Sequence, residues 1–138
     1  MPRYVPLEIT PTIIASHSDL AAFHWVRSGI VADFIIPRAS RSRFRVAFER
    51  AEIVRILDEM TLSTESEATP NDGLVKEHFG YFVEGAAFFN HQSEAFKQVF
   101  KAVKHYRFIT GWTCLDVISS CEPRFSEVHL EDRDVIAG

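Results

Sequence analysis

The sequence predicts an α+β protein in which one or two short helices pack on a largely antiparallel sheet or small barrel of about six strands. Two observations predict this class. Apolar side chains recur at helical spacing in residues 93–103, and from residue 106 to 117 the period changes to two, as in a helix followed by a β-hairpin. Elsewhere, short alternating apolar runs are separated by turn residues. With no linker or repeat, the 138 residues are expected to form a single domain, 1–138.

The first elements are an entry strand, a short helix and a second strand. Prolines in residues 1–16 confine any strand there to a sheet edge. Residues 20–27 predict a short helix that closes at Gly29, although residues 23–26 would also suit a strand. Trp25 falls in this apolar run and is expected in the core. Residues 30–36 are rich in β-branched side chains and predict a strand that stops at a proline.

The middle of the chain alternates strongly and then becomes polar. Residues 44–48 alternate apolar and polar side chains and predict a half-buried strand. Residues 49–60 fit a strand or a helix, and we favour a strand after a bulge or turn. Residues 61–73 predict an acidic loop, and 79–85 a further strand. Residues 86–89 are expected to add another short strand.

The C-terminal part begins with the clearest helix. Ser93 can cap it, and His105 would stand at its C-terminal end, where the helix dipole favours a positive charge. Residues 106–117 form the predicted hairpin, residues 125–130 an edge strand, and residues 131–138 an acidic tail.

Composition narrows the possible functions. The net charge of −4 divides into +3 for residues 1–57, with eight Arg and five acids, and −7 for residues 58–138, with seven bases and fourteen acids. An acidic whole makes general nucleic-acid binding unlikely on charge grounds. Cys114 and Cys121 predict two reduced thiols, and the chain lacks a signal segment or long apolar run, so a cytoplasmic location without membrane contact is expected. The spacing of the six histidines predicts no metal site, and the lack of phosphate-binding glycine motifs predicts no cofactor.

One constellation carries possible catalytic chemistry. His105, Cys114 and Asp116 could supply a base, a nucleophile and an orienting carboxylate. The proposed pocket around them is lined by Tyr81, Phe108 and Trp112. Against this, no cysteine-hydrolase signature surrounds Cys114, and a buried, inert thiol is the default interpretation for a cysteine in a predicted strand.

Arginines concentrate in one predicted strand and the connector before it: Arg38, Arg41, Arg43 and Arg45. Arg43 and Arg45 share a strand face and could bind an anion or nucleic acid, although such a run also suits a solvated strand that protects an edge. Trp112 at the hairpin tip is either a binding anchor or a core residue.

Some local segments resemble a known kind of protein. Residues 48–49 and 54–59, followed by 105–108 and 115–117, resemble small uncharacterised bacterial proteins, some of which act as immunity partners of toxins. The resemblance implies strands at residues 48–57 and carries over no catalytic residue.

These observations together predict a non-catalytic protein–protein interaction module that neutralises a toxin or forms a homodimer. In the first case, Glu65 and Glu67 of the acidic loop would contact a basic partner. A small hydrolase or ligand-binding domain that uses His105, Cys114 and Asp116 is the alternative, and anion or nucleic-acid binding by the arginines is a further one.

Overall fold

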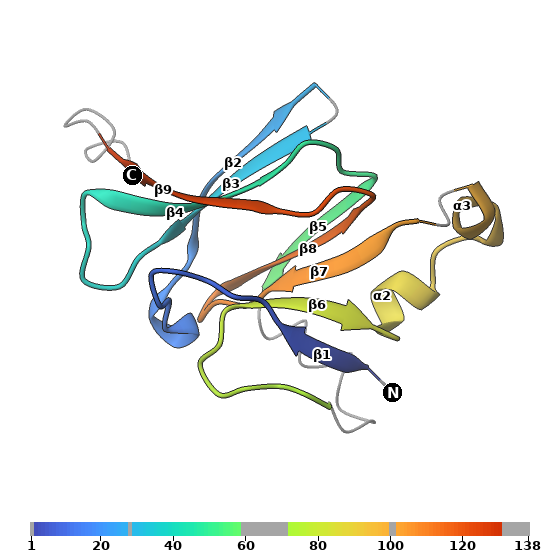
Figure 1. Ribbon diagram of the computed structural model, residues 1–138, viewed down its shortest axis with the longest axis horizontal. Coiled ribbons are helices and arrows are strands. Elements are labelled where there is room, and N and C mark those ends of the chain that lie inside the picture. Colours follow the sequence, from blue (N-terminus) through green and yellow to red (C-terminus); the bar gives the residue numbers. More distant parts are fainter. Residues whose placement is uncertain (1, 28, 59–71, 100–101, 131–138) are drawn as a thin grey trace.

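The protein consists mainly of two antiparallel sheets that face each other (Figure 1). The structure is a computed structural model that describes residues 2–27, 29–58, 72–99 and 102–130. The first sheet contains, in spatial order, β1 (Arg3–Pro6), β6 (Gly80–Glu84), β7 (Lys104–Phe108), β8 (Thr113–Ser119) and β5 (Ile53–Asp58). The second contains β2 (Leu20–Val26), β3 (Gly29–Ile35), β4 (Ser42–Phe48) and β9 (Arg124–His129). The expected largely antiparallel arrangement is confirmed, but the sheets do not close into a barrel.

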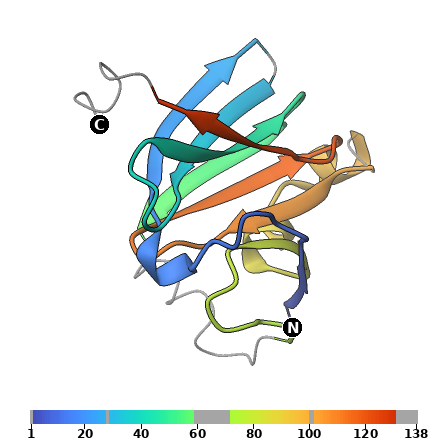
Figure 2. The same ribbon diagram turned by 60° about the vertical axis from the view of Figure 1, so that its left-hand side comes forward.

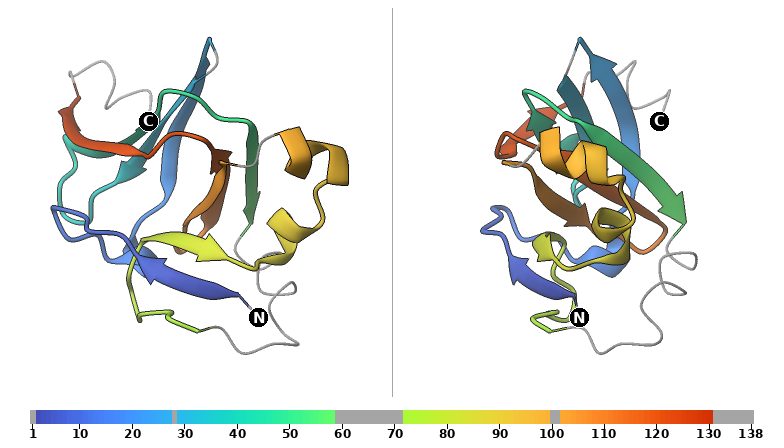
Figure 3. Two further views of the ribbon diagram at one scale, coloured as in Figure 1. Left: turned by 45° about the vertical axis from the view of Figure 1, so that its right-hand side comes forward. Right: turned by 90° about the vertical axis from the view of Figure 1, so that its right-hand side faces the viewer.

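Helices contribute little to the described part of the chain. They are the 3₁₀ turn η1 (Ala15–His17) and the short α-helices α2 (Ala87–Asn90) and α3 (Glu94–Val99). In Figure 3, α2 and α3 lie on the side of the first sheet that faces away from the second sheet. The mixed α+β class is therefore only weakly supported, and the described residues hold nine strands instead of about six.

An aromatic core fills the space between the two sheets, which Figure 2 shows from the side. Along β4, every second residue is buried, from Phe44 to Phe48, as the alternation predicts. Phe34 of β3 packs edge-on against Phe79 with ring centroids 4.7 Å apart, and Phe108 of β7 meets both rings. The twelve phenylalanines of the chain thus supply much of the apolar area that holds the sheets together.

The predicted helix at residues 20–27 is wrong, because this segment is β2, paired antiparallel with β3. Arg27 has a φ of 55°, which suits the tight turn of a hairpin. Gly29 is the first residue of β3 and does not close a helix. A glycine is needed there because a Cβ would lie 2.4 Å from the carbonyl oxygen of Phe48. Pairing with β3 overrides the local helical pattern. Trp25, which we expected in the core, is 53% exposed.

Several other elements were predicted correctly, and one was not. Strands at residues 30–36, 44–48, 79–85 and 125–130 are confirmed as β3, β4, β6 and β9, and the ambiguous segment 49–60 contains strand β5. Residues 86–89, expected as a strand, belong largely to helix α2.

The clearest predicted helix is also shorter than its pattern. Helix α3 ends at Val99, and His105 lies inside strand β7 instead of at a helix end. Val99, one residue of the predicted apolar stripe, is 73% exposed. Residues 104–108 form strand β7 instead, because they pair with both β6 and β8.

Candidate functional site

A cluster of ionisable side chains lies on the outer face of the first sheet, the face opposite the aromatic core. Asp116 of β8 stands between two strands, directly opposite Arg107 of β7 and Arg55 of β5. His105 reaches the same face because it precedes Arg107 by two residues on β7. Tyr4 of β1 completes the set through its hydroxyl group. We call these five residues the Asp116 cluster.

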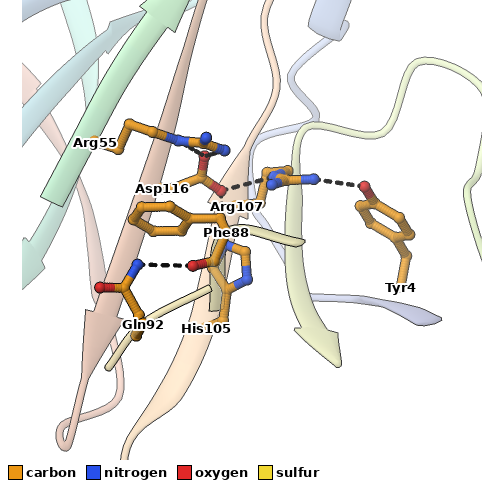
Figure 4. A network of polar contacts seen from close by, with 7 residues as sticks. All are labelled: Tyr4, Arg55, Phe88, Gln92, His105, Arg107 and Asp116. Atoms are coloured by element: carbon orange, nitrogen blue, oxygen red, sulfur yellow. Dashed lines mark hydrogen bonds and ion pairs between the residues drawn. The ribbon is translucent and has the colours of Figure 1, made fainter. Parts of the chain in front are cut away.

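Both carboxylate oxygens of Asp116 are saturated with donors, as Figure 4 shows for the two arginines. Its Oδ1 accepts hydrogen bonds from His105 Nε2 at 2.6 Å and from Arg107 Nε at 2.7 Å. Its Oδ2 accepts from Arg55 Nη2 at 2.7 Å and from Arg55 Nε at 3.0 Å. Arg107 Nη1 also donates to the Tyr4 hydroxyl at 2.7 Å. One carboxylate therefore links strands β5, β7 and β8, and Arg107 extends the connection to β1.

Apart from Arg55, whose side chain is 24% exposed, the cluster is excluded from solvent. The side chain of Asp116 is 0% exposed, and those of His105 and Arg107 are nearly as buried. Burial alone would raise the pKa of Asp116, but its hydrogen bond with His105 and the positive charge of Arg107 hold that pKa well below its ordinary value. Asp116 thus stays ionised among the donors that surround it.

His105 is neutral within this cluster. Burial lowers the pKa of its imidazole below the ordinary value, despite the hydrogen bond to Asp116. An ionised carboxylate only accepts, so Nε2 of His105 carries the proton. Among the residues that the structure describes, neither Nδ1 of His105 nor Nη2 of Arg107 has a hydrogen-bond partner, although both atoms are buried.

Helix α2 covers part of the cluster through Phe88. The guanidinium carbon of Arg55 lies 4.2 Å from the centre of the Phe88 ring, and the His105 ring meets it edge-on at 5.4 Å. Gln92 Nε2 donates a hydrogen bond to the Phe88 carbonyl at 2.7 Å, which fixes the end of this helix (Figure 4). Phe88 is thereby held between the cluster and solvent.

The structure brings His105 and Asp116 together but leaves Cys114 apart. Cys114 and Asp116 alternate to the same face of β8. However, the register places His105 opposite Ile118, four residues from Cys114, which is about 13 Å along a strand. Cys114 lies opposite Leu57 of β5 instead. That spacing does not permit a hydrogen-bonded nucleophile and base.

The expected pocket residues lie on different surfaces. Tyr81 faces the outer side, where its hydroxyl donates to the carbonyl of Val75 at 2.8 Å. Phe108 is in the core between the sheets, and Trp112 is 59% exposed in the turn between β7 and β8. A cavity of about 750 Å³ lies between segments 6–14 and 75–79, and no member of the Asp116 cluster lines it.

The arginines of β4 are committed to contacts within the protein. Arg43 and Arg45 share a face, as predicted, but Arg45 binds Asp33 through two hydrogen bonds of 2.8 and 2.9 Å. Arg43 donates to the carbonyl of Ser42 at 3.0 Å. Arg38 and Arg41 are exposed in the connector that precedes the strand. Glu65 and Glu67, like the acidic tail, lie outside the described residues.

A second surface feature is the free edge of the second sheet, formed by β2. Its end projects beyond the first sheet (Figure 1). Trp25 and Val26 there are 53% and 55% exposed, and Phe23 packs against Trp25 with ring centroids 6.3 Å apart. We call Phe23, Trp25 and Val26 the β2 patch. It is an uncommon feature, because large apolar side chains seldom gather at an open strand edge.

Sequence reasoning missed most of this geometry. Arg107, Arg55, Tyr4 and Phe88 were not assigned to any site with Asp116. A signal did exist for one pair, because Arg107 and Asp116 are opposite charges on the two strands of a predicted hairpin. Arg55 and Tyr4 come from distant segments, so no local pattern connects them to the hairpin.

Comparison with known proteins adds no assignment. A scan against protein-family models finds no match, and searches of curated proteins and of solved structures likewise find none. Among the described residues, no group of three or more potential metal ligands comes together. None of the helices in that part of the chain has the length and apolar character needed to cross a membrane.

The fold defines only a structural class. It consists of two facing antiparallel sheets, with a buried ionic cluster on one outer face and an open edge strand.

Proposed function

We propose that this protein is a non-catalytic protein–protein interaction module that binds an extended protein segment along strand β2. The observation that carries the proposal is that β2 is the one uncharged edge of the two described sheets. The other three edge strands contain residues that discourage pairing, namely Pro6 in β1, Arg55 and Asp58 in β5, and Arg124 and Glu127 in β9.

Strand β2 has no Asp, Glu, Lys, Arg or Pro among its seven residues. An edge strand presents unpaired N–H and C=O groups to an incoming strand, and exposed side chains beside them supply specificity. The β2 patch offers such side chains, with a tryptophan whose large surface suits a binding anchor.

The Asp116 cluster supports a structural role for the groups that could otherwise be catalytic. The carboxylate of Asp116 accepts four hydrogen bonds and has no exposed surface. A catalytic carboxylate or base must reach a substrate, directly or through one water. This cluster instead connects strands, and each of its five side chains takes part in at least one hydrogen bond within it.

Photo-crosslinking at the edge tests the proposal and does not require a candidate partner. A photoreactive amino acid would replace Ala21, which is exposed on β2, in cells that produce the full chain. The matched control is Ser126, which is exposed on the charged edge strand β9. We expect protein adducts from position 21 and not from position 126. Equal yields at the two positions, or none at either, would refute the proposal.

A further inference from the structure

The β2 patch also indicates what its partner is. We propose that β2 pairs antiparallel with β2 of a second copy of this chain, so that two four-stranded sheets become one sheet of eight strands across a two-fold axis. This inference rests on the function proposed above, because it names the occupant of the same edge.

Charge is the first reason for a second copy. Each chain carries a net charge of −4, so two copies repel each other, and an uncharged contact surface adds nothing to that repulsion. Strand β2 provides that surface, since its only ionisable side chain is His24. The three remaining edge strands would each bring charged side chains to a symmetric contact. Self-association is thus least opposed at β2.

The backbone pattern of β2 fixes which residues can accept a partner. Val26 lies opposite Gly29 across a two-residue turn, which makes this pair hydrogen-bonded in the usual hairpin geometry. By alternation, Ala22 and His24 then bond to β3, whereas Phe23 and Trp25 direct their N–H and C=O groups to the open side. These two residues would form the new ladder.

A two-fold axis at His24 gives the best-matched register. Phe23 of one copy would then lie opposite Trp25 of the other, and this pair occurs twice around the axis. The two aromatic side chains already share a face, because their partners in β3, Ala32 and Ile30, both belong to the core-facing side. Paired aromatic residues across antiparallel strands are among the favourable contacts in sheets. The register uses only residues 22–26 and therefore avoids the irregularity between Leu20 and Ala22.

Sedimentation velocity over a concentration series of the full chain tests the assembly. We expect a monomer–dimer equilibrium in the wild type. In Trp25→Lys, a charge replaces the anchor in both copies, and we expect dimerisation to weaken about a hundredfold or more. Trp112→Lys is the matched control, since Trp112 is equally exposed but lies in another turn, and it should dimerise like the wild type. Circular dichroism would verify that both variants fold.

A symmetric disulfide tests the register. In a Cys121→Ser background, His24→Cys should form a covalent dimer under mild oxidation, because the two copies of residue 24 face each other at the axis. Ser126→Cys in the same background should form much less. A covalent dimer at both positions, or at neither, would contradict the register.

The outcomes separate this inference from the function on which it rests. A wild-type chain that stays monomeric at 100-fold dilution and at the highest concentration reached refutes the homodimer. If position 21 then still captures a different protein in cells, the edge is a docking site for that protein and the proposed function survives. A monomeric chain that also yields no adduct at position 21 refutes both. Dimerisation that Trp25→Lys leaves unchanged would refute β2 as the interface.

Discussion

Replacement of Asp116 by asparagine should destabilise this protein more than any other single charge removal that we consider. Asparagine keeps the size of the side chain but removes the negative charge that faces Arg55, Arg107 and His105. It also turns part of an acceptor into an NH₂ donor, which would face donors already in place. The guanidinium group of Arg107 would then lie buried in the first sheet without the carboxylate that it faces.

The expected magnitude follows from burial. Arg107 cannot reach water, because its side chain is 3% exposed, and its charge would remain unpaired in the interior. Removal of one partner from a buried ion pair typically costs about 3–5 kcal/mol. The whole domain is expected to have a free energy of unfolding of about 5–15 kcal/mol, so the variant would retain a fraction of it.

Urea unfolding followed by circular dichroism measures this loss. With a slope of about 2 kcal/mol per molar urea, the midpoint should fall by roughly 2 M while the slope stays constant. The matched control is Asp33→Asn, which also removes a carboxylate held by two hydrogen bonds from one arginine. Its partner Arg45 is 39% exposed and can turn to water, so the loss should be about 1 kcal/mol or less.

A second variant separates charge from packing. If the unpaired charge of Arg107 causes the loss, then Asp116→Asn combined with Arg107→Met should be more stable than Asp116→Asn alone. The recovery would be partial, because the Tyr4 hydroxyl also loses its donor. Equal losses for Asp116→Asn and Asp33→Asn, or no recovery in the double variant, would refute the role assigned to the cluster.

Three more predictions follow from the same contacts. Burial lowers the pKa of His105 in the folded protein, so the unfolded chain binds a proton that the folded protein does not, and the free energy of unfolding should fall as the pH drops below about 6.5. His105→Gln should reduce this loss between pH 7 and pH 5, and a variant with the same pH dependence as the wild type would contradict the prediction. Phe88→Ala should lower the free energy of unfolding by about 1–2 kcal/mol, because the ring leaves Arg55 and His105, and a change in urea midpoint within error would exclude that contact. Cys121 is half-buried and should react with a thiol reagent in the native protein, whereas Cys114 is fully buried and should react only on unfolding. Rapid reaction of both thiols in the native protein would contradict this placement.

The local part of the fold could be predicted because it depends on short-range alternation. Strand β4 alternates buried and half-buried residues along its length. In the hairpin of β7 and β8, the sequence changes from a helical period to a period of two. These patterns need only neighbouring residues to be recognised. The helix predicted for residues 20–27 was wrong for the opposite reason. The same apolar residues suit either a helical face or a strand, and only pairing with β3 decides between them.

The sequence by itself determined that alternating strands and an aromatic core would form, and that His105 and Asp116 belong to adjoining segments. The tertiary structure alone decided that Arg55 joins Arg107 on Asp116, because β5 and β7 are separated in the chain and meet only through their registers with β8. It also decided that Trp25 stays exposed, since the end of the β2–β3 hairpin extends beyond the first sheet that would have covered it. Burial and pairing across distant strands depend on how the two sheets stack, and a local pattern holds no record of that arrangement.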